Sequence, residues 1–207
     1  MMGENRTRGG LYLIRHAETV WNAAPKRFQG RIDVGLSDRG YGQIQNYSIR
    51  LPRFAKVLAS PARRCRDTLT ALLKTIGQAP PVTEDPRLWE IDNGWFSGKT
   101  VSEVESLDPR HLRQWLDAPG SLRPGGGEKI SEMAHRVASV IEEVLESRGG
   151  VDGENILIVT HGGPIRTLIL RSQNRSFDEF HRLDVGNLAT FMLDKGDNGL
   201  VIRQVFE

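Results

Sequence analysis

The sequence is poor in the features that mark secreted, membrane-bound or polyanion-binding proteins. Its 207 residues include one cysteine, Cys65, which excludes an intramolecular disulfide and a cysteine-rich metal site. No stretch approaches the roughly 18 consecutive apolar residues that a transmembrane helix needs. The 28 basic and 26 acidic residues nearly cancel, so the net charge of +2 carries no signature of nucleic-acid binding. Residues 1–10 also lack the apolar core of a signal peptide, and we therefore expect a cytoplasmic protein with no membrane or nucleic-acid partner.

The remaining composition is that of one globular domain. Hydrophobic residues make up 38% of the chain and charged residues 26%, both ordinary values for such a domain. A chain of this length suits a single α/β domain over residues 1–207 with a substantial core. Apolar runs alternate with amphipathic segments along it. This alternation predicts a three-layer α/β/α fold, with a mostly parallel central sheet and helices on both faces.

The expected elements follow from hydrophobic periodicity and from turn residues. Ser37 is a plausible N-cap of one helix, Gly77 ends another, and the apolar stripe that begins at Ile130 predicts the longest. We expect strands at residues 10–14, 56–59, 156–159, 188–193 and 201–206, with a short extended piece at 82–83. We expect helices at residues 37–50, 61–76, 101–116, 130–145 and 164–170.

Two histidines, His16 and His161, each follow an apolar run that we predict to be a buried strand. Leu11–Ile14 leads to Arg15-His16, and Ile156–Val159 leads to Thr160-His161. A lone histidine beside a strand is more often a structural residue than a catalyst. In open α/β sheets, however, ligands bind beyond the carboxyl ends of the strands. Two histidines and an arginine at that edge predict a shared site for an anion.

Four segments stand along the chain in the order Arg15-His16-Ala17-Glu18-Thr19, residues 60–68, Leu88-Trp89-Glu90 and Thr160-His161-Gly162-Gly163. Together they resemble the histidine phosphatase superfamily, in the branch that contains cofactor-dependent phosphoglycerate mutases and many small phosphatases. Each motif is weak alone, but the four together, over residues 10–193, are specific. The resemblance implies a phosphoglycerate mutase-like fold and a metal-independent phosphatase that hydrolyses a small phosphomonoester metabolite through a phosphohistidine.

The same resemblance implies a role for each site residue. Phosphoryl transfer needs an in-line nucleophile, charge compensation and protonation of the leaving oxygen. Neutral His16 would attack phosphorus, and Glu90 would protonate the leaving oxygen and then activate water. Arg15, Arg64 and His161 would surround the phosphate, since a guanidinium fork matches two phosphate oxygens. Further contacts to the substrate are expected from Asn22, Gln29, Gly30 and Gly162.

The choice between neighbouring arginines follows the family spacing. The phosphate arginine stands four residues after Ser60, which selects Arg64 and leaves Arg63 as a surface residue. Cys65 stands where alanine is usual, and we interpret it as a small packed residue and not as a nucleophile. Ala17 replaces a commoner glycine, a change that removes no catalytic group.

Neither a metal nor a cofactor is expected. The five histidines show no paired metal-ligand spacing, and we interpret His111, His135 and His181 as structural or surface residues. The glycine-rich stretch Pro124–Glu128 lacks the Gly-Lys-Ser/Thr of a nucleotide-binding loop. Its last residue, Glu128, either caps the following helix or braces the site.

Two rival functions stay open at this level. A cofactor-dependent phosphoglycerate mutase would use the same phosphohistidine, although the short stretch between Glu90 and His161 favours hydrolysis. A non-catalytic member would only bind phosphorylated ligands or proteins, which the intact set of site residues argues against. A protein phosphohistidine phosphatase is a further alternative.

The substrate itself is not specified by these motifs. The partner that we expect is a small phosphorylated metabolite, with sugar phosphates, phosphoserine and ribazole phosphate all open. Trp115 and Phe96 could form an apolar lid, although core packing is the commoner use of large aromatic residues. Whether the chain forms a homodimer is also open. Four basic residues could form a rim around the site: Lys26, Arg27, Arg31 and Arg166. They either select a second acidic group on the substrate or are solvated surface charges.

Overall fold

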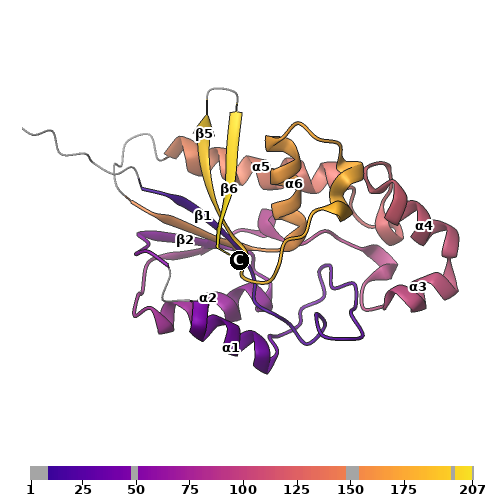
Figure 1. Cartoon of the computed structure of the whole chain (residues 1–207), viewed down its shortest axis with the longest axis horizontal. Helices are drawn as coiled ribbons and strands as arrows, with labels where there is room; N and C mark the ends of the chain where they lie inside the picture. The colour runs from indigo at the N-terminus through magenta and orange to yellow at the C-terminus, as the bar shows by residue number, and fades with distance from the viewer. Residues whose placement is uncertain (1–8, 48–50, 148–153, 197–198, 207) are drawn as a thin grey trace, which may run out of the picture.

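A six-stranded sheet runs through the computed structural model, which describes residues 9–47, 51–147, 154–196 and 199–206 (Figure 1). The strand order is β3-β2-β4-β1-β5-β6. The first four strands in this order are parallel, β5 is antiparallel to β1, and β6 is antiparallel to β5. The predicted mostly parallel sheet is therefore confirmed. The strands are β1 (Leu11–Arg15), β2 (Lys56–Ala59), β3 (Val82–Glu84), β4 (Ile156–Thr160), β5 (Thr190–Gly196) and β6 (Gly199–Phe206).

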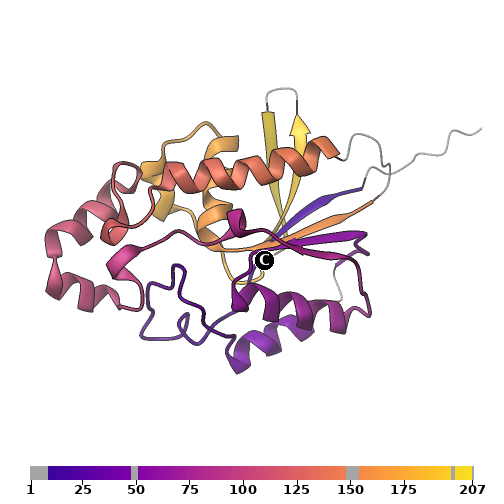
Figure 2. The same cartoon turned by 180° about the vertical axis from the view of Figure 1, so that it is seen from behind.

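Helices cover both faces of the sheet because its central strands are apolar on both faces. In β4, Ile156 and Ile158 pack into one core cluster, whereas Leu157 and Val159 pack into another. Successive side chains of a strand alternate in direction, so a fully apolar strand needs cover on each side. Figures 1 and 2 show α5 and α6 over one face and α1 and α2 over the other. These helices are α1 (Asp38–Tyr47), α2 (Arg63–Thr75), α5 (Ile130–Ser147) and α6 (Gly162–Ser172).

The prediction of a single helix over residues 101–116 is wrong. The structure has two helices, α3 (Val101–Leu107) and α4 (Pro109–Asp117), which meet at Asp108. Proline lacks a backbone N–H and its ring clashes with the preceding turn, so α3 cannot continue through Pro109. The Asp108 side chain accepts a hydrogen bond from the His111 amide at 3.0 Å and caps α4. The two short helices lie together at one end of the molecule (Figure 1).

Other boundaries agree with the sequence to within a few residues. Ser37 caps α1 as predicted, since its hydroxyl accepts from the Gly40 amide at 3.0 Å. The predicted end of this helix, residues 48–50, lies outside the described residues, as do residues 197–198 of the turn before β6. Strand β5 begins at Thr190 and not at Leu188, because Leu188 has a φ of 62°, which no strand residue adopts.

None of the helices in the described ranges combines the length and the apolar character that crossing a membrane requires.

The cap of α4 can be tested by stability. Replacing Asp108 with Ala should lower the free energy of unfolding by about 1 kcal/mol, because the first turn of α4 loses its hydrogen-bond acceptor. Urea denaturation followed by circular dichroism measures this change. Asp117→Ala, at the exposed far end of the same helix, is the matched control and should not lower stability. Equal losses in the two variants would show that the cap contributes nothing.

Candidate active site

A cavity of about 250 Å³ is lined by residues that follow β1 and β4. These strands are parallel neighbours, and their last residues, Arg15 and Thr160, are paired in register. The histidines that come next along the chain are therefore side by side, with ring centroids 5.3 Å apart. The predicted site residues that line the cavity are Arg15, His16, Asn22, Gln29, Gly30, Arg64 and Glu90.

His16 is a buried neutral imidazole whose Nε2 makes no hydrogen bond within the described residues. Its Nδ1 lies 2.8 Å from the Ala17 carbonyl oxygen, which can only accept, so Nδ1 carries the proton. Burial lowers the pKa of His16 well below the usual 6.5, and the positive charges of Arg64 and Arg15 lower it further. Nε2 is therefore unprotonated at neutral pH, as a nucleophile requires.

The backbone around His16 is fixed by contacts from three parts of the chain. The His16 amide donates to the Thr160 carbonyl at 2.9 Å, and the Ala17 amide donates to the Thr68 hydroxyl at 3.0 Å. The Asn187 side chain donates to the His16 carbonyl at 3.0 Å. Sequence reasoning gave Asn187 no role, because no local pattern connects it with His16.

Arg64 is fully buried and is bound by groups that carry no negative charge. Its Nη2 donates to the Gly30 carbonyl at 2.8 Å and its Nη1 to the Ile32 carbonyl at 3.0 Å. Its Nε donates to His161 Nδ1 at 3.0 Å. Gly30 has a φ of 53°, a conformation that favours glycine and that bends this loop around the guanidinium. Burial lowers the pKa of Arg64, but a guanidinium stays charged at neutral pH.

His161 lies behind the cavity and does not belong to its lining. Because Nδ1 accepts from Arg64, the ring proton is on Nε2, which donates to the Ser60 hydroxyl at 2.8 Å. Burial and the nearby Arg64 charge lower the pKa of His161 well below 6.5. Both ring nitrogens of His161 are thus hydrogen-bonded to protein groups. The sequence did not predict that Ser60 would be one of these partners.

Glu90 is held by two backbone amides. Ile91 donates to its Oε1 at 2.9 Å and Gly163 donates to its Oε2 at 3.2 Å. A Cβ atom at Gly163 would lie 2.1 Å from Oε1, so only glycine allows this approach. Gly163 lines the cavity, whereas the predicted Gly162 does not and lies against Arg15.

The cavity holds more positive than negative charge. Arg15 donates from Nη1 to the Val185 carbonyl, and its buried Nε has no hydrogen-bond partner among the described residues. Burial lowers the pKa values of Arg15 and Arg166, yet both guanidiniums stay protonated. An unpaired buried donor is costly unless a ligand completes it. The arrangement therefore suits an anion beside the His16 ring.

The four residues of the predicted basic rim separate into two groups. Arg27 and Arg166 line the cavity. Arg31 is directed elsewhere and lies 3.6 Å from a Glu128 oxygen, and Lys26 is exposed outside the lining.

Aromatic residues close one side of the cavity. Trp115 lines the cavity but is also buried in the core cluster, and Phe96 is fully buried in the same cluster. Both therefore pack in the core, which was the commoner of the two uses considered for them. Phe180 and His181 also line it, and the sequence did not single them out for the site. His181 Nε2 lies 3.1 Å from the Trp115 carbonyl, which fixes its ring. They reach the cavity from the 3₁₀ turn Phe177–Arg182, which no local motif connects with the strand ends.

The remaining candidates for metal or thiol chemistry are placed as follows. No cluster of three or more His, Cys, Asp or Glu side chains in the described part of the chain could hold a metal ion. His111 contacts the Arg123 carbonyl at 3.0 Å, and His135 is exposed. Cys65 is fully buried, and burial raises the pKa of its thiol to about 12. It packs as a small residue, as predicted.

Comparison with known proteins agrees with this geometry. The model of the histidine phosphatase superfamily (branch 1) matches residues 11–207. Phosphoserine phosphatase 1 of Hydrogenobacter thermophilus is 33% identical over 160 residues, which cover 76% of this chain and 73% of that protein. A metal-independent phosphoserine phosphatase of Arabidopsis thaliana is 33% identical over 165 residues, 78% and 67% of the two chains. Bacillus stearothermophilus YhfR superposes with a TM-score of 0.85 at 26% identity, over 95% of this chain and 96% of its own.

The two buried histidines predict a pH dependence of stability. In the folded protein the pKa values of His16 and His161 lie well below 6.5, whereas the unfolded chain takes up protons near that value. Their contribution is complete above the unfolded pKa and is lost as the pH falls toward the folded pKa. Each histidine should therefore cost up to about 1.4 kcal/mol per pH unit below about pH 6.5.

Urea denaturation at several pH values between 7 and 5 measures this slope. His16→Gln should make the slope shallower, and His135→Gln, at an exposed position, is the matched control. A stability that stays constant across this range would contradict the buried neutral histidines.

Proposed function

This chain belongs to the histidine phosphatase superfamily (branch 1), and we propose that its cavity hydrolyses a small phosphomonoester through a phosphohistidine on His16. One observation carries the proposal. The neutral His16, whose Nε2 makes no hydrogen bond among the described residues, lies in a cavity that Arg15, Arg64 and Arg166 also line. A nucleophile beside several fixed guanidinium charges supports attack on a phosphoryl group.

The proposed reaction has two displacement steps. His16 Nε2 attacks phosphorus, the bond to the ester oxygen breaks, and protonated Glu90 gives its proton to that leaving oxygen. The Glu90 carboxylate then takes a proton from a water molecule, whose oxygen attacks the phosphohistidine. Inorganic phosphate is released, and His16 and protonated Glu90 are restored. One difficult displacement is thus replaced by two easier ones.

The proposed phosphate ligands compensate for charge on the non-bridging oxygens. Arg15 and Arg64 supply fixed positive charge, which costs no reorganisation during the reaction. Asn22 lines the cavity, and its Oδ1 accepts from the Thr19 amide at 3.0 Å. Its NH₂ group makes no hydrogen bond within the described residues, so we propose it as a neutral donor to the phosphate. In this scheme His161 acts through Arg64, whose Nε it binds at 3.0 Å, and holds this guanidinium at the phosphate.

The nucleophile is tested by removing it. His16→Ala should reduce the hydrolysis of p-nitrophenyl phosphate in EDTA by at least about 1,000-fold, because no other described group offers the same lone pair. Phosphate release measures the rate, and mass spectrometry of alkali-quenched enzyme should find a phosphoryl group on the peptide that carries His16. His135→Ala is the control and should keep wild-type activity. Equal rates for His16→Ala and the wild type would refute the role of His16.

The mutase alternative is distinguished with 3-phosphoglycerate and a bisphosphoglycerate primer. Hydrolysis predicts that phosphate release outruns isomerisation. Rapid isomerisation with little phosphate release would identify a mutase.

Arg166 supports a narrower class of substrate. Its Nε donates to the Leu183 carbonyl at 2.8 Å, and its guanidinium lies over the Phe180 ring, 5.3 Å from the centroid. Within the described residues, neither Nη atom of Arg166 makes a hydrogen bond, although the side chain lines the cavity. A fork fixed in this way suits a carboxylate. We therefore propose a phosphomonoester whose leaving group carries a second anionic group, as phosphoserine does.

Phosphoserine and phosphoethanolamine form a matched pair for this test, because they differ only in the carboxylate. Arg166→Gln should lower kcat/KM for phosphoserine by about 10- to 100-fold, the worth of a charge-assisted contact. The value for phosphoethanolamine should change by less than about 3-fold, since it never made that contact. Arg171→Gln, on the same helix but outside the cavity, is the control. Equal losses on both substrates would show that Arg166 does not read the carboxylate.

A further inference from the structure

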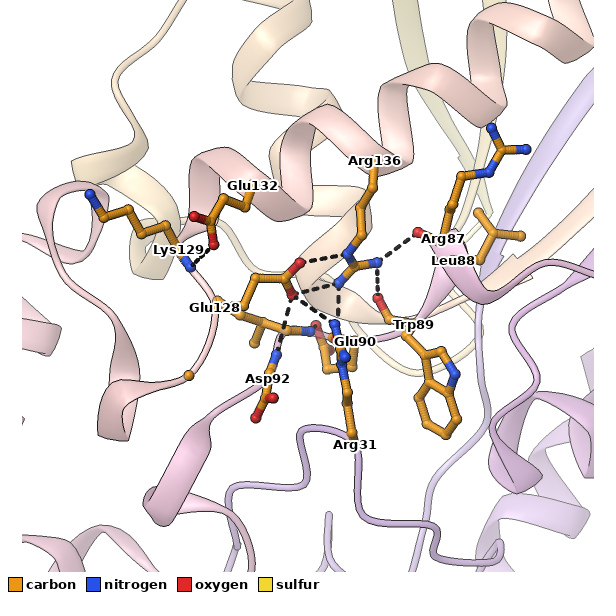
Figure 3. A network of polar contacts seen from close by, with 12 residues as sticks. Arg31, Arg87, Leu88, Trp89, Glu90, Asp92, Glu128, Lys129, Glu132 and Arg136 are labelled. Carbon is orange, nitrogen blue, oxygen red and sulfur yellow. Dashed lines mark hydrogen bonds and ion pairs between the residues drawn. The ribbon is translucent and has the colours of Figure 1, made fainter.

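Glu128 and Arg136 form a nearly buried ion pair beside the segment that carries Glu90 (Figure 3). Arg136 Nε donates to Glu128 Oε1 at 2.7 Å, and Nη2 donates to Oε2 at 2.8 Å. The side chains are only 16% and 11% exposed, and neither lines the cavity. Burying such a pair is costly unless its remaining donors and acceptors also find partners. Where those partners lie indicates what the pair does.

The remaining donors of Arg136 are used on the backbone that carries Glu90. Nη1 donates to the carbonyls of Arg87 and Trp89, both at 2.6 Å, and Nη2 donates to the Glu90 carbonyl at 3.1 Å. Arg87 lies in the 3₁₀ turn Pro86–Leu88 and residues 89–93 belong to no strand or helix, so no sheet neighbour pairs with these carbonyls. Buried carbonyl groups without a ladder need another donor. Figure 3 shows the Arg136 side chain reaching from α5 to this segment.

Glu128 holds the same segment on the other side of Glu90. Its Oε2 accepts from the Asp92 amide at 3.3 Å, and its own amide donates to the Asp92 carbonyl at 2.9 Å. Arg31 approaches the same carboxylate at 3.6 Å from the loop that binds Arg64. One ion pair therefore fixes the backbone immediately before and after Glu90.

We propose that Glu128 and Arg136 are positioning residues for proton donation by Glu90, an inference that rests on the proposed function of Glu90. The Glu90 carboxyl is bound by the amide of the next residue, Ile91, so its position follows the local backbone. A general acid works only within hydrogen-bond reach of the leaving oxygen. Loss of Arg136 leaves the carbonyls at 87, 89 and 90 without their donor, and loss of Glu128 leaves Arg136 and the Asp92 amide without their carboxylate partner. Either change should shift the Glu90 carboxyl. His16 keeps its own contacts, which come from other segments.

Leaving-group dependence separates positioning from a general structural effect. An alkyl phosphate such as phosphoserine expels a poor leaving group that needs a proton, whereas p-nitrophenolate leaves without one. The ratio kcat/KM reports steps up to phosphoryl transfer and is blind to the later hydrolysis of the phosphohistidine. Glu128→Gln should lower kcat/KM for phosphoserine by about 10- to 100-fold, and that for p-nitrophenyl phosphate by less than about 3-fold.

Two further variants complete the comparison. Glu90→Gln should show the same substrate pattern with a larger loss, because it removes the acid itself. Glu132→Gln is the matched control, in the first turn of α5, the helix that carries Arg136 and begins just after Glu128. Glu132 pairs with Arg123 and with the Lys129 amide and makes no contact with the Glu90 segment, so both substrates should keep their wild-type values.

Each outcome decides between explanations. If folded Glu128→Gln, checked by circular dichroism, loses the same factor on both substrates, the ion pair is structural and the positioning role is refuted. If Glu90→Gln also lowers kcat/KM by the same factor for both substrates, the proposed role of Glu90 as the general acid is refuted. Arg136→Lys keeps the buried positive charge but cannot span the carboxylate and three carbonyls, and it serves if Glu128→Gln does not fold. It should show the same selective loss, and uniform loss would again refute positioning.

Discussion

The buried guanidinium of Arg64 is the constraint on which the rest of the site depends. A full positive charge out of water needs hydrogen bonds on every side, and here they come from the carbonyls of Gly30 and Ile32 and from His161. These contacts fix the loop that lines one wall and set the tautomer of His161. The charge itself helps to keep His16 neutral by lowering its pKa. Because no carboxylate neutralises it within the described residues, the charge also stays available to an anion in the cavity.

The sheet delivers the other parts of the site to this arginine. Strands β1 and β4 are parallel neighbours in register, so chain segments far apart in the sequence end at the same place. Thr68, one turn after Arg64 on α2, donates to the Arg64 carbonyl and accepts from the Ala17 amide, which ties this helix to the His16 turn. Packing of apolar strands between two helical layers thus specifies the positions of groups that are themselves polar.

Local patterns in the sequence predicted what depends on neighbouring residues. The bounds of β2, the cap at Ser37 and the placement of both histidines at strand ends are set by short apolar runs and turn residues. The break at Asp108 was readable from Pro109, but the apolar spacing on either side favoured one helix. The entry of His181 into the cavity depends on packing between distant segments, as does the contact of Asn187 with His16. No period in a single sequence encodes such contacts.

The arginines show why helical periodicity could mark α5 as a core helix yet miss Arg136. Periodicity identifies the apolar face, but it does not say which polar side chain will turn inward to unpaired carbonyls. The ion pairs of the structure separate two groups of arginines. Arg87, Arg123 and Arg136 each have a carboxylate partner and hold segments of the fold together. Arg15, Arg64 and Arg166 have no carboxylate partner in the described ranges, and all three line the cavity. Uncompensated buried charge is costly, so its concentration at one place supports the proposed binding of an anion there.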